Sequence, residues 1–423
     1  PSLVGSEMCI RDRSWTGHWV TKEMDAWIDM TLMKNWNEFS KALKNFGVPG
    51  QNIVYADTSG NIGWRPAVYV PIRKEGFSMV PRPGEDTTYT WAGKIPYGKM
   101  PYLYNPSIGY IATANNKTIS DEFPYYISGL WADPSRAARI NNLLEEKLVF
   151  SIDDMMSIQL DHKSNFALDV LPLILDVGRS NLTKGQLLVY DYLERWDAVE
   201  KEESKGALFF HIFLNEFITN IYKDELNLLG EGYFESYASL KYLTLRKLRQ
   251  ILQGQPSSWL DNVSTVGKYE TLEDNILKSF QGTYESVKKN YGHNSENWKW
   301  GDAHSLTHQH ILSKVKILDY LLSLNIGPFK SGGSSLTPNA GGYAFGKSFK
   351  QTSGASMRRV VDLSIMNNTK AIMPTGQSGL QRSPHYDDQA KLYHKGKYRN
   401  TIFDEKIIRS DRKLRKLIFT PGK

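Results

Sequence analysis

A long run of helical periodicity, from about residue 135 to residue 325, is the feature that most limits what this chain can fold into. Strand-like segments lie before and after it. A sheet interrupted by a helical insertion accounts for this order, so the predicted fold class is α+β. Apolar stripes at helical spacing predict helices near residues 185–196, 205–223, 236–253, 270–290 and 304–324.

The segment before the helical run reads as helix followed by strands. Residues 24–46 carry apolar side chains at helical spacing. Residues 52–57 and 62–72 are strand-like and are separated by a turn signal that ends in Gly60-Asn61, which predicts a hairpin. A further short strand is predicted at Gly109–Thr113.

The helical run and the segment after it carry local signals of their own. Ser151 followed by Asp154 predicts a helix start, with the serine as N-cap and the aspartate in the first turn. Beyond the helical run, residues 357–363 and 371–374 are the predicted strands.

Composition excludes some classes of protein. The chain has 423 residues, of which 40% are hydrophobic and 23% charged, which is typical of a globular protein. The net charge of +7 is scattered except near Arg409–Lys416, so a solvated C-terminal face is favoured over a nucleic-acid site. No stretch approaches the ~18 apolar residues of a membrane span. Cys9 is the single cysteine, which excludes an intrachain disulfide.

The first thirteen residues differ from the rest. Residues 1–13 have no helix or strand period and contain Cys9. They resemble a translated sequencing-adapter scar, and the alternative is a genuine disordered tail. We therefore expect residues 1–13 to make no packed contacts and residues 14–423 to carry the fold, with the helical insertion at about 135–325.

Several short segments, in order along the chain, together resemble one protein family. They are Trp15–Gly17, Lys34–Phe39, Asn52–Gly63, Gly109–Asn116, Trp131–Ile140, Asn297–Gly301, Gly376–Gly379 and Ser383–Gln389. Each segment alone is weak, but their order and spacing are similar to the C-terminal part of the β chain of penicillin acylases (penicillin amidases), which are N-terminal-nucleophile hydrolases. The resemblance implies the α-β-β-α sandwich of that class, incomplete here.

The resemblance also implies a mechanism. In the family, a serine at the N-terminus of the β chain attacks an amide carbonyl, and its own α-amine acts as the base. The amine suits this role because its pKa lies at about 7.7–8.0. The matching position precedes Trp15, so the nucleophile is expected to be absent from this chain, and Ser14 does not replace it. We expect the chain alone to be inactive and poorly stable.

Two residues match family positions that carry chemistry. Asn115 falls at the oxyanion position, where a fixed amide N–H stabilises the charge on the former carbonyl oxygen. Arg136 matches an arginine that orients that asparagine and the terminal amine through its planar fork of donors. The structural alternatives are a turn residue for Asn115 and a surface ion pair for Arg136. Arg139 is expected to be structural.

Two other constellations are weaker. His304, His308 and His310 suggest a metal site, because positions 304 and 308 would share a helix face, but hydrogen-bonded packing histidines are favoured. His385 with Ser378 suggests a Ser–His–Asp triad, but Gly-Gln-Ser-Gly lacks the nucleophile-elbow pattern. No catalytic metal is predicted.

The resemblance suggests further properties of the intact parent. Family members often bind a structural calcium, and one of the contributing aspartates aligns near Tyr125, so a calcium is possible only through residues outside this chain. The expected partners are an α chain and the N-terminal part of the β chain from the same precursor, with a small-molecule amide as substrate. Neither nucleic acid nor a membrane span is expected. The expected compartment is periplasmic or secreted.

Two functions compete at this point. The first is hydrolysis of a linear amide between an acyl group and an amine. Penicillins, cephalosporin side chains and acyl-homoserine lactones are substrates within the family. The second is a non-catalytic homologue that acts as a binding or structural protein.

Overall fold

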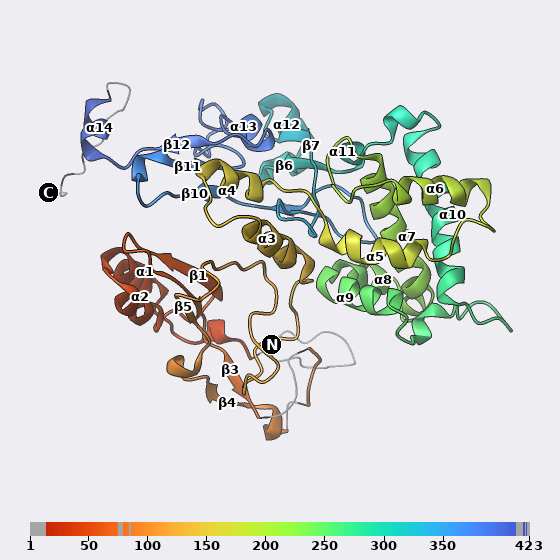
Figure 1. The fold of residues 1–423 in the computed structure, drawn as a ribbon, viewed down its shortest axis with the longest axis horizontal. Coiled ribbons are helices and arrows are strands. Elements are labelled where there is room, and N and C mark those ends of the chain that lie inside the picture. Colours follow the sequence, from red (N-terminus) through yellow and green to blue (C-terminus); the bar gives the residue numbers. More distant parts are fainter. Residues whose placement is uncertain (1–13, 75–78, 84–85, 412–417, 419, 421–423) are drawn as a thin grey trace. The chain divides into compact units, whose positions relative to one another are not determined.

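The computed structural model describes residues 14–74, 79–83, 86–411, 418 and 420, which form two compact units that divide between Ala132 and Asp133 (Figure 1). Residues 1–13, for which we predicted no packed contacts, lie outside the described residues. Both units mix helices with small antiparallel sheets, so the predicted α+β class is confirmed.

The first unit begins with two helices and continues as strands. Its elements are α1 (Glu23–Leu32), α2 (Trp36–Leu43), β1 (Gln51–Ala56), β2 (Ile62–Ala67), β3 (Pro71–Arg73), β4 (Trp91–Lys94) and β5 (Leu103–Tyr104). The order β1-β2-β5 makes a three-stranded sheet, and β3 pairs with β4. The predicted hairpin is confirmed: β1 and β2 pair antiparallel, and the Asp57 carboxylate accepts the Ser59 and Asn61 amides at 2.9 and 3.0 Å in the turn.

The apolar pattern of residues 24–46 corresponds to two helices. Asn35 has extended backbone and its side chain accepts the Glu38 amide at 3.0 Å, so α2 starts with its own N-cap. The helix α2 buries Phe39 and Leu43 toward the hairpin, whereas α1 packs on α2 and buries only Ala26. The small core of this unit contains Ala26, Phe39, Leu43, Phe46, Tyr55 and Ala67.

The predicted strand at Gly109–Thr113 is wrong. Gly109 has φ +81 and donates its amide to the Pro106 carbonyl at 2.9 Å, which is a turn. Within the described residues, 109–113 pair with no strand. The local sequence of residues 109–113 is typical of a strand, but a strand also needs a neighbouring strand with which to form backbone hydrogen bonds.

The second unit opens with a bundle of helices. They are α3 (Ser135–Glu145), α4 (Ile152–Gln159), α5 (Asn165–Leu175), α6 (Lys184–Glu194), α7 (Lys205–Leu228), α8 (Tyr233–Ser239), α9 (Lys241–Leu252) and α10 (Leu272–Tyr291). The predicted start at Ser151 is confirmed as a full capping box with Asp154. The long helix α7 packs against α6, α8 and α10 and is buried along most of its length (Figure 1). The sequence analysis missed α5.

The chain then returns to short strands. The remaining elements are α11 (Trp300–Ala303), β6 (Ser305–His308), α12 (Lys316–Leu322), β7 (Ile326–Lys330), β8 (Gly341–Gly342), β9 (Ser353–Gly354), β10 (Arg358–Val360), β11 (Thr369–Ile372), α13 (Ala390–His394), β12 (Arg399–Thr401) and α14 (Glu405–Ser410). The predicted strands near 357–363 and 371–374 are confirmed as β10 and β11, which pair antiparallel, and β12 pairs with β11.

The predicted helix 304–324 is wrong in its first half. Ser305–His308 forms β6 and pairs antiparallel with β7, with Leu306 opposite Phe329. Only the second half is helical, as α12. The pairing with a strand some twenty residues further along outweighs the local helical spacing, as tertiary context often does.

Candidate functional site

Asn115 lies in the first unit, in the loop after β5. Its backbone is left-handed, with φ +62, a conformation that asparagine tolerates better than most residues. Its carbonyl accepts the Ala132 amide at 2.9 Å, and the neighbouring Asn116 side chain accepts the Ala114 amide at 3.0 Å. The loop backbone is therefore fixed on both sides of Asn115, while the residue itself is exposed.

Arg136 lies in the second unit, in the first turn of α3. Burial lowers the pKa of its guanidinium, and the Tyr242 hydroxyl opposes that shift. The side chain lines a cavity of about 300 Å³, together with Gln159, Asn339 and Arg358. Arg136 is thus half-buried at the wall of a cavity.

Buried ion pairs hold the start of α3 in place. Asp133 accepts the Ser135 amide at 3.0 Å and also pairs with Arg249 of α9 at 3.0 Å, and Arg249 reaches Asp169 of α5 at 2.6 Å. Arg139 pairs in two-pronged fashion with Asp161, at 3.0 and 2.7 Å. These contacts make Arg139 a structural residue, as expected, and they fix the helix turn from which Arg136 projects.

Asn115 and Arg136 belong to different compact units. Their roles and the meeting of their side chains remain predictions.

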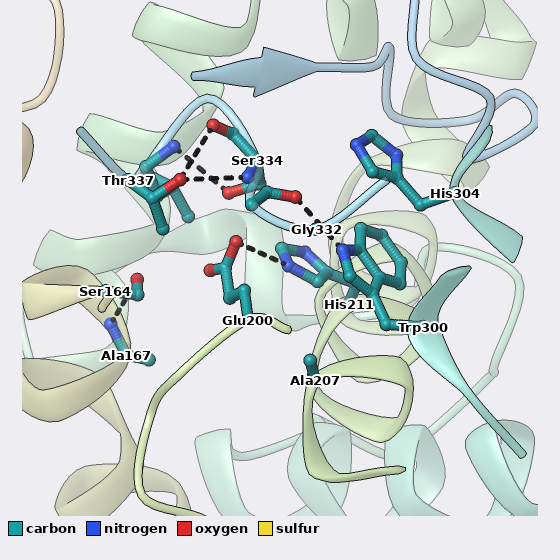
Figure 2. Close-up of polar contacts among 12 residues, drawn as sticks. Ser164, Ala167, Glu200, Ala207, His211, Trp300, His304, Gly332, Ser334 and Thr337 are labelled. Carbon is teal, nitrogen blue, oxygen red and sulfur yellow. Dashed lines mark hydrogen bonds and ion pairs between the residues drawn. The ribbon is translucent and has the colours of Figure 1, made fainter. Parts of the chain in front are cut away.

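A second polar cluster lies deep in the second unit, and sequence reasoning did not find it (Figure 2). Glu200 and His211 are fully buried, and the Glu200 carboxylate lies 3.4 Å from His211 Nε2. His211 Nδ1 lies 2.9 Å from the Tyr343 hydroxyl. Neither Glu200 oxygen accepts a well-aligned hydrogen bond from a described residue. A histidine in the apolar run of α7 was the only signal available in the sequence.

Trp300 connects this cluster to the loop 331–337. Its ring stacks between His211 and His304, with centroid distances of 4.1 and 4.6 Å, and its indole N–H donates to the Gly333 carbonyl at 3.0 Å (Figure 2). The loop then turns back on itself where the Ser334 amide donates to the Thr337 hydroxyl at 3.1 Å. A buried aromatic side chain therefore holds the backbone of this loop.

Acid is expected to destabilise the second unit. Burial lowers the pKa of His304 to about 4, and burial together with His308 and Arg358 lowers the pKa of His394 to about 4, from an ordinary value of 6.5. The unfolded chain takes up these protons near pH 6.5, whereas the folded protein resists them until about pH 4. Stability is therefore complete above pH 6.5 and is lost as pH falls toward 4. For His304 the loss is on the order of a few kcal/mol.

Urea unfolding at a series of pH values between 7.5 and 4.5 measures this slope. The variant His394→Gln should flatten it. An equal slope in the wild type and His394→Gln would contradict the contribution of His394.

The histidine pattern does not form a metal site. His304 directly precedes β6 and His308 is its last residue. The two histidines therefore do not share the helix face that the sequence predicted. His304 Nδ1 lies 2.6 Å from the Phe349 carbonyl, and His310 caps a short turn by accepting the Leu312 amide. Among the described residues, no three His, Cys, Asp or Glu side chains are grouped to hold a metal ion.

The residues present also do not fit the calcium site of the family. Tyr125, at the aligned position, packs partly against the apolar cluster of Val70, Ile95 and Met100. A phenol in an apolar setting is a poor substitute for a carboxylate ligand.

The suggested triad is not assembled either. His385 Nδ1 lies 3.1 Å from Asp388, but His385 is exposed. The Ser378 hydroxyl accepts the Leu380 amide at 3.1 Å, and the Ser378 amide donates to the His385 carbonyl. These are turn contacts, typical of serine in loops.

Comparison with known proteins places the fold and the family. The chain superposes on a thermostable penicillin G acylase from Alcaligenes faecalis with a TM-score of 0.64 and 19% identity, covering 95% of this chain and 74% of that one. The fold is therefore that of an N-terminal-nucleophile hydrolase, as predicted. The penicillin amidase family model matches residues 10–410, and the chain belongs to this family.

The relatives are named as acylases. The chain is 26% identical over 421 residues to acyl-homoserine lactone acylase QuiP of Pseudomonas syringae pv. syringae, which covers 95% of this chain and 50% of that protein. It is 27% identical over 317 residues to penicillin G acylase of Escherichia coli, which covers 68% and 36%. The chain thus spans about half the length of the curated relatives it matches. None of the described helices is long and apolar enough to cross a membrane.

Proposed function

We propose that this protein is an acylase that hydrolyses a linear amide between an acyl group and an amine. The family match over residues 10–410 is the observation that supports this most. Two relatives are named as acylases, one for acyl-homoserine lactones and one for penicillin G. Both names refer to an amide bond between an acyl group and an amine, but the acyl and amine parts differ. Their difference leaves both penicillin-like and lactone-bearing amides as candidate substrates.

The proposed reaction uses an acyl-enzyme. An N-terminal serine, supplied by sequence other than these 423 residues, attacks the amide carbonyl while its own amine takes the proton. Asn115 donates a side-chain amide N–H to the resulting oxyanion, and Arg136 orients that asparagine and the terminal amine. When the intermediate collapses, the C–N bond breaks and the departing amine takes the proton from the terminal amine. Water then hydrolyses the acyl-enzyme, which releases the acid and restores the serine. The fixed loop around Asn115 and the half-buried position of Arg136 support these roles. The chain alone would then be inactive.

Assembly and compartment follow from the same proposal. The nucleophile is exposed by self-cleavage of a precursor, which makes the precursor a zymogen. The partners are the α chain and the N-terminal part of the β chain from that precursor. The proposed location, on family resemblance, is the periplasm or the exterior. The proposed physiological role is the processing of antibiotics of the penicillin type.

A hydrolysis panel tests the function. The complete precursor is expressed, its self-cleaved N-terminus is identified by mass spectrometry, and release of free amine is measured. The panel contains a phenylacetyl amide, penicillin G and acyl-homoserine lactones of several acyl lengths. We expect turnover of at least one class. A processed protein with an N-terminal serine that cleaves none of them would favour the non-catalytic homologue.

A further inference from the structure

Arg358 is a buried cation in the second unit. It projects from β10 and is 7% exposed. Its guanidinium donates to the Tyr393 carbonyl at 2.8 Å and to Asn339 Oδ1 at 3.0 Å, and it lies 3.8 Å over the Tyr393 ring. Its Nε is buried and has no acceptor among the described residues. Every acceptor it does have is neutral.

No carboxylate of a described residue lies within ion-pair distance of Arg358. This is unusual, because removing a charge from water is costly unless an opposite charge or a full set of hydrogen bonds compensates for it. Asn339 also lies 2.7 Å from His162 Nε2, which adds no negative charge. An anion that is not part of this chain would supply the missing charge.

Arg358 faces space that such an anion could fill. It lines the cavity of about 300 Å³ that Arg136 also lines, and Gln159, Asn339 and Ala355 form other parts of the wall. No acidic side chain is among the residues that line this cavity. Burial, and to a lesser degree the charge of Arg136, lower the pKa of the Lys241 ammonium, so Lys241 lies close to Arg136.

The adjoining cavity is less suitable. It has a volume of about 190 Å³ and shares Arg358 with the larger one, but its wall carries Glu202 and Glu203 beside Lys201 and Lys330. Mixed charge at that wall reduces its attraction for an anion. The described residues that line the larger cavity, in contrast, include Arg358 and no acidic side chain.

We propose that the cavity between Arg358 and Arg136 binds the carboxylate of a small organic acid. A planar guanidinium matches a carboxylate in a two-pronged geometry, and such charge-assisted bonds are stronger than neutral ones. The cavity is far larger than the ~10–15 Å³ that one water requires, so it admits a molecule with an organic body as well as its charged end.

The origin of the acid rests on the proposed function. Amide hydrolysis releases the acyl group as a carboxylic acid, so the product would carry the required group, and a substrate with a carboxylate on its amine part would carry it too. Binding itself does not depend on turnover. The two proposals can therefore fail separately. The protein could hydrolyse an amide without binding a carboxylate in this cavity, or bind a carboxylate there without hydrolysing any amide.

Calorimetric titration of purified protein that contains the whole 423-residue chain tests the proposal. The probes are sodium phenylacetate and sodium octanoate, with neutral phenylacetamide, sodium chloride and inorganic phosphate as comparisons at matched ionic strength. We expect saturable binding of a carboxylate and none of the neutral amide. Arg358→Gln should weaken that binding about 10- to 100-fold, the effect of one charge-assisted contact. The matched control is Arg359→Gln, which removes an equal charge from an exposed position on the same strand and should change binding less than about twofold.

A second variant keeps the test decisive if Arg358→Gln does not fold. Ala355→Leu fills the larger cavity without changing its charge, and it should abolish carboxylate binding in a protein that retains Arg358. Carboxylate binding that is unaffected by Ala355→Leu, equal binding of phosphate, or no binding of either acid to the wild type would each overturn the proposal. Loss of binding in Ala355→Leu with retention in Arg359→Gln supports it.

Discussion

Replacing Asn115 by alanine in the catalytically active enzyme is expected to lower kcat by about 10²–10³-fold, the usual effect of losing one oxyanion donor. The side-chain amide N–H of Asn115 would contact the former carbonyl oxygen, whose negative charge develops only in the transition state. The substrate carbonyl gains less from the same contact, so KM should change little. Steady-state kinetics on the best amide of the hydrolysis panel measure both constants.

The backbone of Asn115 requires matched variants. Its φ of +62 disfavours alanine by about 1–2 kcal/mol, so a loss of activity in Asn115→Ala could include a change in the loop. Glycine accepts this backbone without strain, and Asn115→Gly therefore removes only the side chain. Asn115→Asp keeps a residue tolerant of this conformation while removing the N–H donors. All three variants should lose kcat to a similar degree.

The control is Asn116→Ala. Within the part of the chain that the structure describes, the Asn116 side chain hydrogen-bonds only to local backbone, through the Ala114 amide and the Lys117 carbonyl, at 3.0 and 3.1 Å. Its loss should weaken the loop without removing an oxyanion donor. Normal kcat in Asn115→Gly, or an equal loss in Asn116→Ala, would show that Asn115 has no catalytic role of its own.

Local signals in the sequence predicted local structure well. The Ser151–Asp154 pattern predicts a capping box, and the turn before Ile62 predicts a hairpin, because each depends on residues within a few positions of one another. Gly109–Thr113 and the first half of 304–324 were misassigned for the opposite reason. Their conformation depends on whether a partner strand lies alongside, and spacing within the segment does not report that.

The same limit applies to the sites. Arg136 and Asn115 could be nominated because they lie in segments that resemble a family. Glu200 and His211 are eleven residues apart, but the third member of their cluster, Tyr343, is 132 residues beyond His211. Arg358 could not be recognised as buried and without an acidic partner until Tyr393 and Asn339 were placed beside it. Contacts between residues far apart in the sequence determine which polar side chains are buried away from water. The local sequence pattern does not predict that burial.

Replacing Trp300 by alanine is expected to destabilise the second unit by about 3–5 kcal/mol, the range for removing a large buried aromatic side chain. Trp300 is 0% exposed and stacks between two buried histidines, so its removal leaves a void that the rings of His211 and His304 cannot fill. Trp300→Phe keeps part of the packing but removes the donor to the Gly333 carbonyl, and should cost about 1–3 kcal/mol.

Urea unfolding measured by circular dichroism checks this order, with Tyr320→Ala as the matched aromatic control in the same unit. Tyr320 is 86% exposed on α12, so its loss should change stability by less than about 0.5 kcal/mol. The larger effect of Trp300→Ala follows because the indole both fills the core and holds the backbone of loop 331–337 through Gly333.

Asn339 follows that loop and contacts Arg358, so Trp300→Phe should also weaken carboxylate binding, whereas Tyr320→Ala should not. A Trp300→Ala protein as stable as the control would mean that the stacked histidines, and not the indole, hold this part of the unit together.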